Sequence, residues 1–240
     1  MEHAVLELLV QKGHVAPREP GFEAATGTPR EQELVTLIAD ALAGLLALDG
    51  RFAPVVVPGD IPDGIAVDGA LFLHADGSVS PSASGFSFGY PDYDVNRRLA
   101  ELLAAEFQRL SGHPPRRRDN ATSNERGYYG FSRVATLGPE VLVEHGFLTN
   151  PGEGLWLFGN VDGLAVAEYR ALCTFFGLEP RADRPERPWP VPLPLWVWPW
   201  MAWRLAGAPP GERPGSAPRL VPLWAWVRLQ ALIRARDERG

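Results

Sequence analysis

Two histidines and a glutamate stand at the ends of apolar runs that are typical of buried strands. Glu144 directly follows Val141–Val143, and a glycine and an Asn-Pro step then close this segment. His74 ends a second apolar run, and His14 follows a third after a Gln-Lys-Gly step. An α/β sheet brings strand ends together at one edge. This pattern therefore predicts a metal hydrolase with its site at that edge.

Zinc chemistry would give these residue types a common function. Catalytic Zn²⁺ usually takes three protein ligands, drawn from His and carboxylate, and leaves a fourth position open for water. Two neutral imidazoles and one carboxylate leave a net positive charge, which lowers the pKa of the bound water toward 7 and polarises an amide carbonyl. Incidental loop histidines are the alternative explanation of the same pattern.

The identity of the carboxylate ligand is left open by the residues alone. Glu31 heads a predicted helix, where acidic residues are also common because they complement the helix dipole. Glu33 is its nearest rival, but it lies about 200° further round the helix, so the two cannot face one metal ion. Glu23 and Asp76 are further alternatives.

Glu144 is the predicted general base. Hydrolysis of an amide needs a group that takes a proton from water and returns it to the leaving nitrogen, which a carboxylate beside a metal ion can do. A solvated acid at a strand end is the alternative. His145 is predicted to point to the other side of the strand, away from the metal, in a supporting or surface position. His113 and His3 are assigned to a loop and to the terminus.

Strands and helices alternate along residues 1–178, which predicts an α/β fold with a mostly parallel sheet. Cys173 is the single cysteine, so an intramolecular disulfide is excluded, and we expect a buried thiol on a helix. Apolar residues at helical spacing predict helices over 31–48, 95–110 and 162–176. The predicted strands are 4–10, 55–57, 70–73, 85–90, 131–134 and 141–143.

Four sequence blocks, in their order and spacing, resemble the zinc-dependent N-acetylmuramoyl-L-alanine amidases, which cut peptidoglycan between its glycan and its stem peptide. The blocks are Gly13-His14 with Pro20-Gly21, Glu31 at a helix start, Phe72–Asp76 with Ala83–Phe86, and Val141–Pro151. The family usually has Gly-Gly after the first histidine, where this chain has Val15-Ala16. We therefore expect a differently shaped loop around His14.

The resemblance implies a three-layer α/β/α catalytic domain over residues 1–178 with Zn²⁺ as its cofactor. It implies His14, Glu31 and His74 as zinc ligands and Glu144 as the catalytic acid and base. The substrate would be bacterial peptidoglycan, cut between N-acetylmuramic acid and L-alanine. The alternatives are another zinc amidohydrolase or carboxypeptidase acting on small acyl-amino acids or peptides, and a wall-binding protein without catalysis.

Composition changes after residue 178. Residues 179–193 are proline-rich, which is typical of a semi-rigid linker. Residues 194–240 repeat a Pro-Leu-Trp-Xaa-Trp motif and are interpreted as a cationic, Trp-rich tail of two short helices. From residue 181 onward ten Arg oppose five acids, whereas residues 1–180 carry a net charge of −11. We expect the tail to bind anionic wall or envelope polymers. The alternatives are an interfacial amphipathic segment that perturbs an outer membrane, and packing of its Trp residues on the catalytic domain or on each other.

We expect no secretory leader, because the first predicted strand begins at residue 4. We also expect no membrane span, because no apolar run is long enough to cross a bilayer. A wall hydrolase without a leader needs another route to its substrate. Together with the resemblance, this favours a phage endolysin that stays in the host cytoplasm until a holin pore releases it to the cell wall. A host enzyme of wall remodelling or sporulation is the alternative. Neither a nucleic-acid partner nor stable membrane insertion is indicated.

Overall fold

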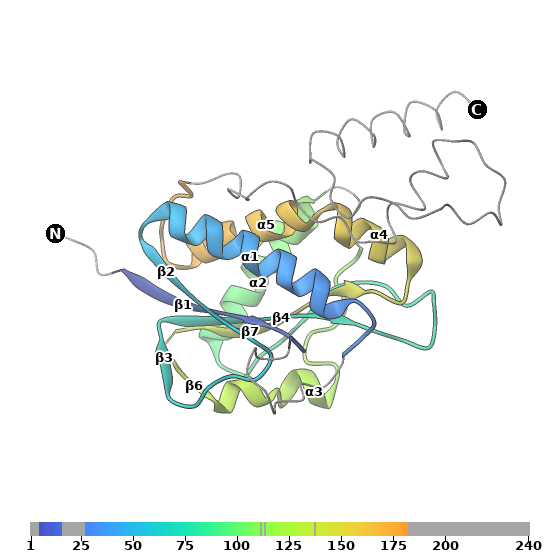
Figure 1. The fold of residues 1–240 in the computed structure, drawn as a ribbon, viewed down its shortest axis with the longest axis horizontal. Coiled ribbons are helices and arrows are strands. Elements are labelled where there is room, and N and C mark those ends of the chain that lie inside the picture. The colour runs from blue at the N-terminus through green and yellow to red at the C-terminus, as the bar shows by residue number, and fades with distance from the viewer. Residues whose placement is uncertain (1–4, 16–26, 111, 113, 137, 182–240) are drawn as a thin grey trace, which may run out of the picture. The chain divides into compact units, whose positions relative to one another are not determined.

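Five strands form the central sheet, in the order β2-β1-β4-β7-β5 (Figure 1). Four of them run parallel: β1 (Leu6–Lys12), β2 (Phe52–Val57), β4 (Gly69–Asp76) and β7 (Glu140–Phe147). The short edge strand β5 (Ser87–Gly89) pairs antiparallel with β7. The mostly parallel mixed sheet predicted from the sequence is therefore confirmed.

The protein is described by a computed structural model that covers residues 5–15, 27–110, 112, 114–136 and 138–181. The predictions for the linker beyond residue 181 and for the tail, and those for His3, Glu23 and His113, lie outside these residues. Within the described part of the chain, no helix is both long and apolar enough to cross a membrane.

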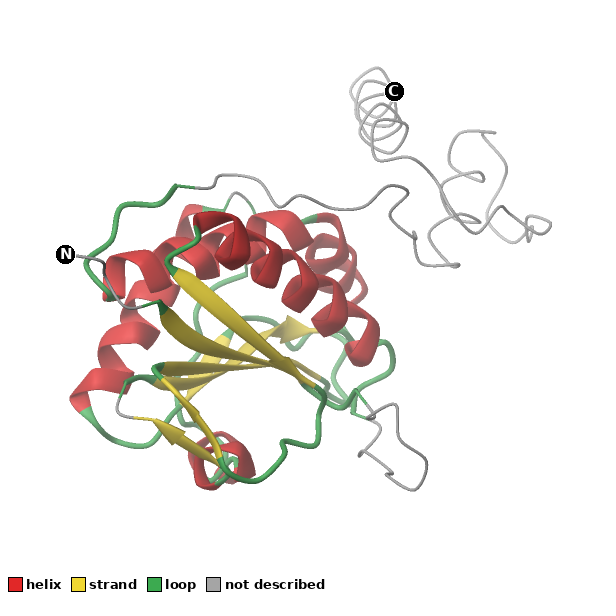
Figure 2. Cartoon of the chain, turned by 60° about the vertical axis from the view of Figure 1, so that its left-hand side comes forward, coloured by secondary structure: helices red, strands yellow, loops and turns green. Residues whose placement is uncertain are grey.

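Helices cover one face of the sheet, and shorter elements cover the other (Figure 2). On the first face, α5 (Val161–Phe175) packs against both α1 (Glu31–Asp49) and α2 (Asp94–Arg109), and α4 (Pro151–Gly159) follows β7. The elements of the other face are α3 (Ser123–Arg126), the 3-10 helix η1 (Tyr129–Ser132), and the two-stranded parallel sheet of β3 (Ile65–Val67) and β6 (Val134–Thr136). The α/β layering is as predicted, with a thin third layer.

Side chains along the strands alternate between two apolar clusters. The helix-side cluster takes Leu8, Val10, Leu71, Leu73, Val141 and Val143. The cluster on the other face takes Leu9, Phe72 and Leu142, with Tyr128 and Phe131 against it. The same alternation puts Gln11, His74 and Glu144 on the second face and His145 on the helix side. Gln11, His74 and Glu144 thus lie on the same side of the sheet.

The structure differs from the predicted elements in several places, and three of these differences lie near the residues of interest. The expected strand at 131–134 is wrong, because η1 occupies its first two residues and β6 begins only at Val134. β4 and β7 continue past His74 and Glu144, so these residues lie inside strands rather than at their tips. The Asn-Pro step does not simply close β7: Asn150 accepts hydrogen bonds from the first backbone N–H groups of α4, an element that was not expected.

Candidate metal centre

Three side chains that are distant in the sequence converge on the carboxyl side of the sheet. Ligand atoms of His14, Glu31 and His74 all lie within 4.8 Å of one another. Glu31 Oε1 is 3.6 Å from His14 Nε2 and 3.1 Å from His74 Nδ1. The two imidazole rings stand nearly perpendicular, with centroids 4.9 Å apart. No other group of His, Cys, Asp and Glu in the described part of the chain converges in this way.

Backbone N–H groups hold the Glu31 carboxylate in place at the start of α1. Its Oε1 accepts from the N–H of Ala75 over 3.0 Å, and its Oε2 accepts from the N–H of Thr28 over 2.8 Å. Burial alone would raise the pKa of Glu31, but His74 and these two N–H groups hold that pKa below its ordinary value. Glu31 is therefore an ionised carboxylate at neutral pH.

The rival carboxylates have other partners. Glu33 pairs with Arg30 over 2.6 Å and its side chain is 39% exposed. Asp76 pairs with Arg117. Of the described acidic residues that the sequence left as alternatives, Glu31 is thus the one that faces both histidines.

Two glycines allow the side chains of the candidate metal centre to lie close together. A Cβ atom at position 13 would lie 2.4 Å from the carbonyl oxygen of Leu73 and 2.6 Å from Cε1 of His74. A Cβ atom at Gly27, whose φ is +63°, would lie 2.6 Å from Glu31 Oε2 and 2.7 Å from the ring of His14. Only a residue without a side chain fits at either point. The Gly-His pair at the end of β1 therefore positions His74 as well as His14.

The donor set fits a zinc ion. Burial lowers the pKa of His74, although Glu31 opposes this shift, so the ring is neutral at neutral pH. Two imidazoles and one carboxylate in a small volume are the ligands that catalytic Zn²⁺ takes in proteins. A divalent cation between them would also offset the charge of a carboxylate that is otherwise buried beside neutral rings.

Glu144 lies beside His74 on the neighbouring strand, since the two are register partners in the β4–β7 pairing. Its Oε2 is buried and has no hydrogen-bond partner in the described part of the chain. Burial raises the pKa of Glu144 well above its ordinary value, and the charges of Asp76 and Glu31 raise it further. A buried carboxyl with a raised pKa next to a candidate metal centre is suited to proton transfer.

His145 takes no part in the metal group. It is fully buried on the helix side of the sheet, with its ring stacked on Phe107. Its Nδ1 is 2.7 Å from the backbone carbonyl oxygen of His74, and its Nε2 is 2.8 Å from Glu168 Oε1. The predicted separation of His145 from Glu144 by strand alternation is found, whereas a surface position is wrong.

Sequence reasoning missed the polar residues that support the site. Tyr128 Oη lies 3.0 Å from His74 Nε2 and donates to Gln11 Oε1 over 2.7 Å. Arg117 pairs with Asp76 and donates to Ser87 Oγ over 2.7 Å. Strand alternation could have placed Gln11 on the face of the site. Tyr128 and Arg117 belong to irregular segments, which carry no periodic signal.

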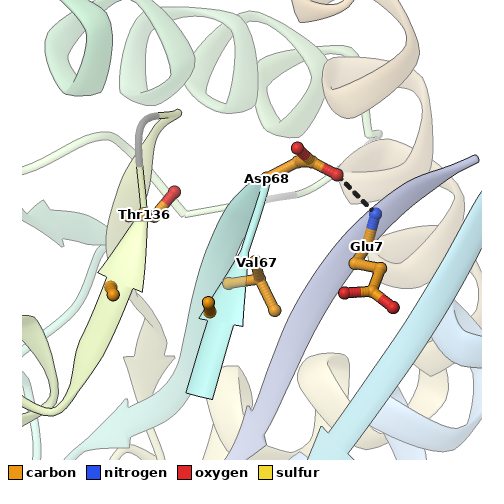
Figure 3. A pocket seen from close by; sticks show the side chains of 6 residues that line it. Glu7, Val67, Asp68 and Thr136 are labelled. Atoms are coloured by element: carbon orange, nitrogen blue, oxygen red, sulfur yellow. Dashed lines mark hydrogen bonds between the residues drawn. The ribbon is translucent and has the colours of Figure 1, made fainter. Parts of the chain in front are cut away.

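An open cavity of about 450 Å³ lies away from this centre, between the start of β1 and the two-stranded sheet (Figure 3). Its lining residues are Glu7, Ala66, Val67, Asp68, Ala135 and Thr136. Asp68 accepts a hydrogen bond from the backbone N–H of Glu7 over 2.8 Å, so this carboxylate holds two chain segments together. The cavity contains none of the His14, Glu31 and His74 donors.

The fold and this donor set define an α/β protein with a candidate hydrolytic metal centre at the carboxyl edge of a mostly parallel sheet. A family model described as N-acetylmuramoyl-L-alanine amidase matches residues 8–172. The chain belongs to this family. Its reaction is hydrolysis of the amide bond between N-acetylmuramic acid and L-alanine in peptidoglycan, so the chain acts on the bacterial cell wall.

Solved amidase structures share the fold. The catalytic domain of CwlV, an N-acetylmuramoyl-L-alanine amidase from Bacillus (Paenibacillus) polymyxa var. colistinus, is 18% identical with a TM-score of 0.55, covering 72% of this chain and 99% of that one. An N-acetylmuramoyl-L-alanine amidase from Clostridium difficile 630 is 19% identical with a TM-score of 0.55, covering 73% and 98%. The catalytic domain of the CD27L endolysin, which targets Clostridia difficile, is 16% identical with a TM-score of 0.55, covering 70% and 97%. No curated protein sequence matches the chain.

Proposed function

We propose that the chain hydrolyses the N-acetylmuramoyl–L-alanine bond with a zinc ion held by His14, Glu31 and His74 and with Glu144 as the proton carrier. The observation that carries the proposal is the convergence of the three ligand atoms within 4.8 Å. When bound there, zinc would polarise the scissile carbonyl and acidify water at neutral pH. The remaining steps belong to side chains of this protein.

Glu144 would take a proton from the attacking water and return it to the nitrogen of L-alanine as the C–N bond breaks. The water oxygen ends on the carbonyl carbon of the muramic acid, and the stem peptide leaves with a free amino group. The negative charges of Asp76 and Glu31 favour the protonated form of Glu144. A cation beside Glu31 would offset this effect and make the basic form available.

Replacing Glu144 with glutamine in the full-length chain tests this assignment. We expect zinc binding within a few-fold of the parent, and release of alanine amino groups from purified peptidoglycan reduced by about 10²- to 10⁴-fold. Glu140→Gln is the matched control, because Glu140 begins the same strand and also has a buried oxygen without a partner in the described residues. The control should hydrolyse peptidoglycan at the parent rate.

Three outcomes would contradict the proposal. Unchanged hydrolysis by Glu144→Gln would remove Glu144 from the mechanism. Full zinc binding by His14→Ala together with His74→Ala would remove the metal assignment. Release of terminal amino acids, rather than new alanine amino ends, would favour a zinc carboxypeptidase, and pelleting with walls without any hydrolysis would favour a binding protein.

The cellular context stays a separate prediction. We propose a phage endolysin whose segment 194–240 binds anionic wall polymers; the seven Arg and three acids of this segment support the binding. The full-length chain should pellet with intact cell walls and less with walls stripped of anionic polymers. Equal pelleting with both preparations would refute binding through those polymers.

A further inference from the structure

A chain of side-chain hydrogen bonds leads from a backbone carbonyl to the candidate zinc ligand His74. Gln11 is fully buried near the end of β1, and its Nε2 lies 2.7 Å from the carbonyl oxygen of Gly59 and 3.0 Å from Tyr129 Oη. Its Oε1 accepts from Tyr128 Oη over 2.7 Å. Tyr128 Oη in turn lies 3.0 Å from His74 Nε2.

The direction of each hydrogen bond follows from the first one. A backbone carbonyl can only accept, so the NH₂ group of the Gln11 amide must face Gly59. This orientation leaves Oε1 of Gln11 to face Tyr128, and the single hydroxyl proton of Tyr128 is donated there. The oxygen of Tyr128 is then left to accept, so a proton on Nε2 of His74 is donated to it. Nδ1 of His74 faces Glu31 Oε1 over 3.1 Å, and a nitrogen that binds a metal ion there must release any proton it shares with this carboxylate.

Aromatic packing fixes this geometry. The ring of Tyr128 lies 5.2 Å from that of His74, 5.3 Å from that of Phe72 and 4.9 Å from that of Tyr129, measured between centroids. Gly59 also donates its N–H to the carbonyl of Val15 over 2.7 Å. The backbone of Gly59 therefore contacts both the hydrogen-bond chain that leads to His74 and the residue that follows His14.

We propose that Gln11 and Tyr128 are positioning residues that hold the Nε2–H group of His74 and so direct its Nδ1 toward the metal ion. The proposal rests on the metal centre proposed above. The hydrogen-bond partner of the other ring nitrogen commonly sets the tautomer of a metal-binding histidine, and losing such a partner costs about 10- to 100-fold in metal affinity. Here a glutamine acting through a tyrosine would fill this role.

Tyr128→Phe removes the acceptor of the His74 proton while keeping the ring. In the full-length chain we expect zinc affinity, measured by chelator competition, to fall about 10- to 100-fold. In the zinc-loaded protein, NMR should show the Nε2–H proton of His74 as hydrogen-bonded in the parent and without that hydrogen bond in the variant. If Tyr128 acted only by packing its ring, the resonance of this proton would not change.

Two further variants sharpen the test. Gln11→Met should also lower zinc affinity. The double variant should bind zinc no more weakly than Tyr128→Phe alone, because Gln11 acts through Tyr128. Tyr90→Phe is the matched control, since it removes a hydroxyl that contacts Asp119 instead of a candidate ligand. The control should keep the parent zinc affinity, and thermal unfolding should show that all variants are folded.

The outcomes separate this proposal from that of the metal centre. If the parent binds zinc, and Tyr128→Phe keeps both the parent zinc affinity and the parent Nε2–H resonance of His74, the positioning role alone is overturned. Additive losses in the double variant also overturn it, because Gln11 would then act independently of Tyr128. A parent chain that binds no zinc refutes the metal centre itself, and with it the role of Tyr128 in directing Nδ1 toward a metal ion.

Discussion

His145 and Glu168 form a fully buried pair directly behind the candidate metal centre, with Nε2 of the histidine 2.8 Å from Oε1 of the glutamate. The other ring nitrogen of His145 donates to the backbone carbonyl of His74 over 2.7 Å. The pair therefore connects α5 to the point where the β4–β7 register shifts, between His74 and Asp76. It supports the backbone of a candidate ligand from the face opposite to the metal.

Removing one member of this pair should destabilise the protein strongly. His145→Phe leaves Glu168 as a buried carboxylate without its partner, and we expect a loss of about 3–5 kcal/mol in the free energy of unfolding, measured with urea. The double variant His145→Phe with Glu168→Leu should lose less than His145→Phe alone, because no uncompensated charge stays buried. Losses that simply add would contradict this explanation.

The close approach of β1 to β4 should make Gly13 intolerant of any side chain. In Gly13→Ala the new Cβ would lie 2.4 Å from the Leu73 carbonyl oxygen, so the strand or His74 must move. We expect a loss of about 1–3 kcal/mol in unfolding free energy, together with weaker zinc binding. Gly159→Ala is the control for the same change, because a Cβ there meets nothing within 4 Å. Equal stability of the two variants would show that the approach is not tight.

The sequence predicted the parts of this site that depend on regular structure. The apolar pattern from Glu31 to Leu48 predicted α1 almost to the residue, and strand alternation separated His145 from Glu144. The extension of β7 past Glu144 was not predictable in this way, because it depends on a register shift and on Gly146, whose φ is +144°. Tyr128 reaches His74 from a non-periodic segment through packing against Phe72, which only the folded chain shows.

Zinc should stabilise the folded chain in proportion to its occupancy. Binding to the folded state alone adds about 2.7 kcal/mol to the free energy of unfolding at a zinc concentration 100 times the dissociation constant. Thermal unfolding with zinc, and after removal of zinc by a chelator, measures this difference. Mg²⁺ should give no comparable effect, because two of the three proposed ligands are imidazoles. If zinc still raised the unfolding temperature of His74→Ala, the ion would bind at another site.

Glu140 should make the protein less stable as the pH rises. Burial raises the pKa of its carboxyl to about 7, so the folded state holds this proton more tightly than the unfolded state does. Its contribution to stability is therefore fully present below the ordinary glutamate pKa and is lost as the pH rises through about 7. Glu140→Gln should be more stable than the parent at pH 8, by about 1 kcal/mol after allowance for partial exposure to solvent.

Urea unfolding of both proteins at pH 4 and pH 8 measures this effect, and the difference should vanish at pH 4. Glu101→Gln provides a control of opposite sign, because the hydrogen bond from Arg116 holds the pKa of Glu101 below its ordinary value. That variant should be less stable than the parent at pH 8 and approach it as the pH falls. If Glu140→Gln were instead less stable than the parent at pH 8, the ionised carboxylate of Glu140 would have a stabilising partner in the folded state. Burial of its unpaired Oε2 would then no longer explain the raised pKa.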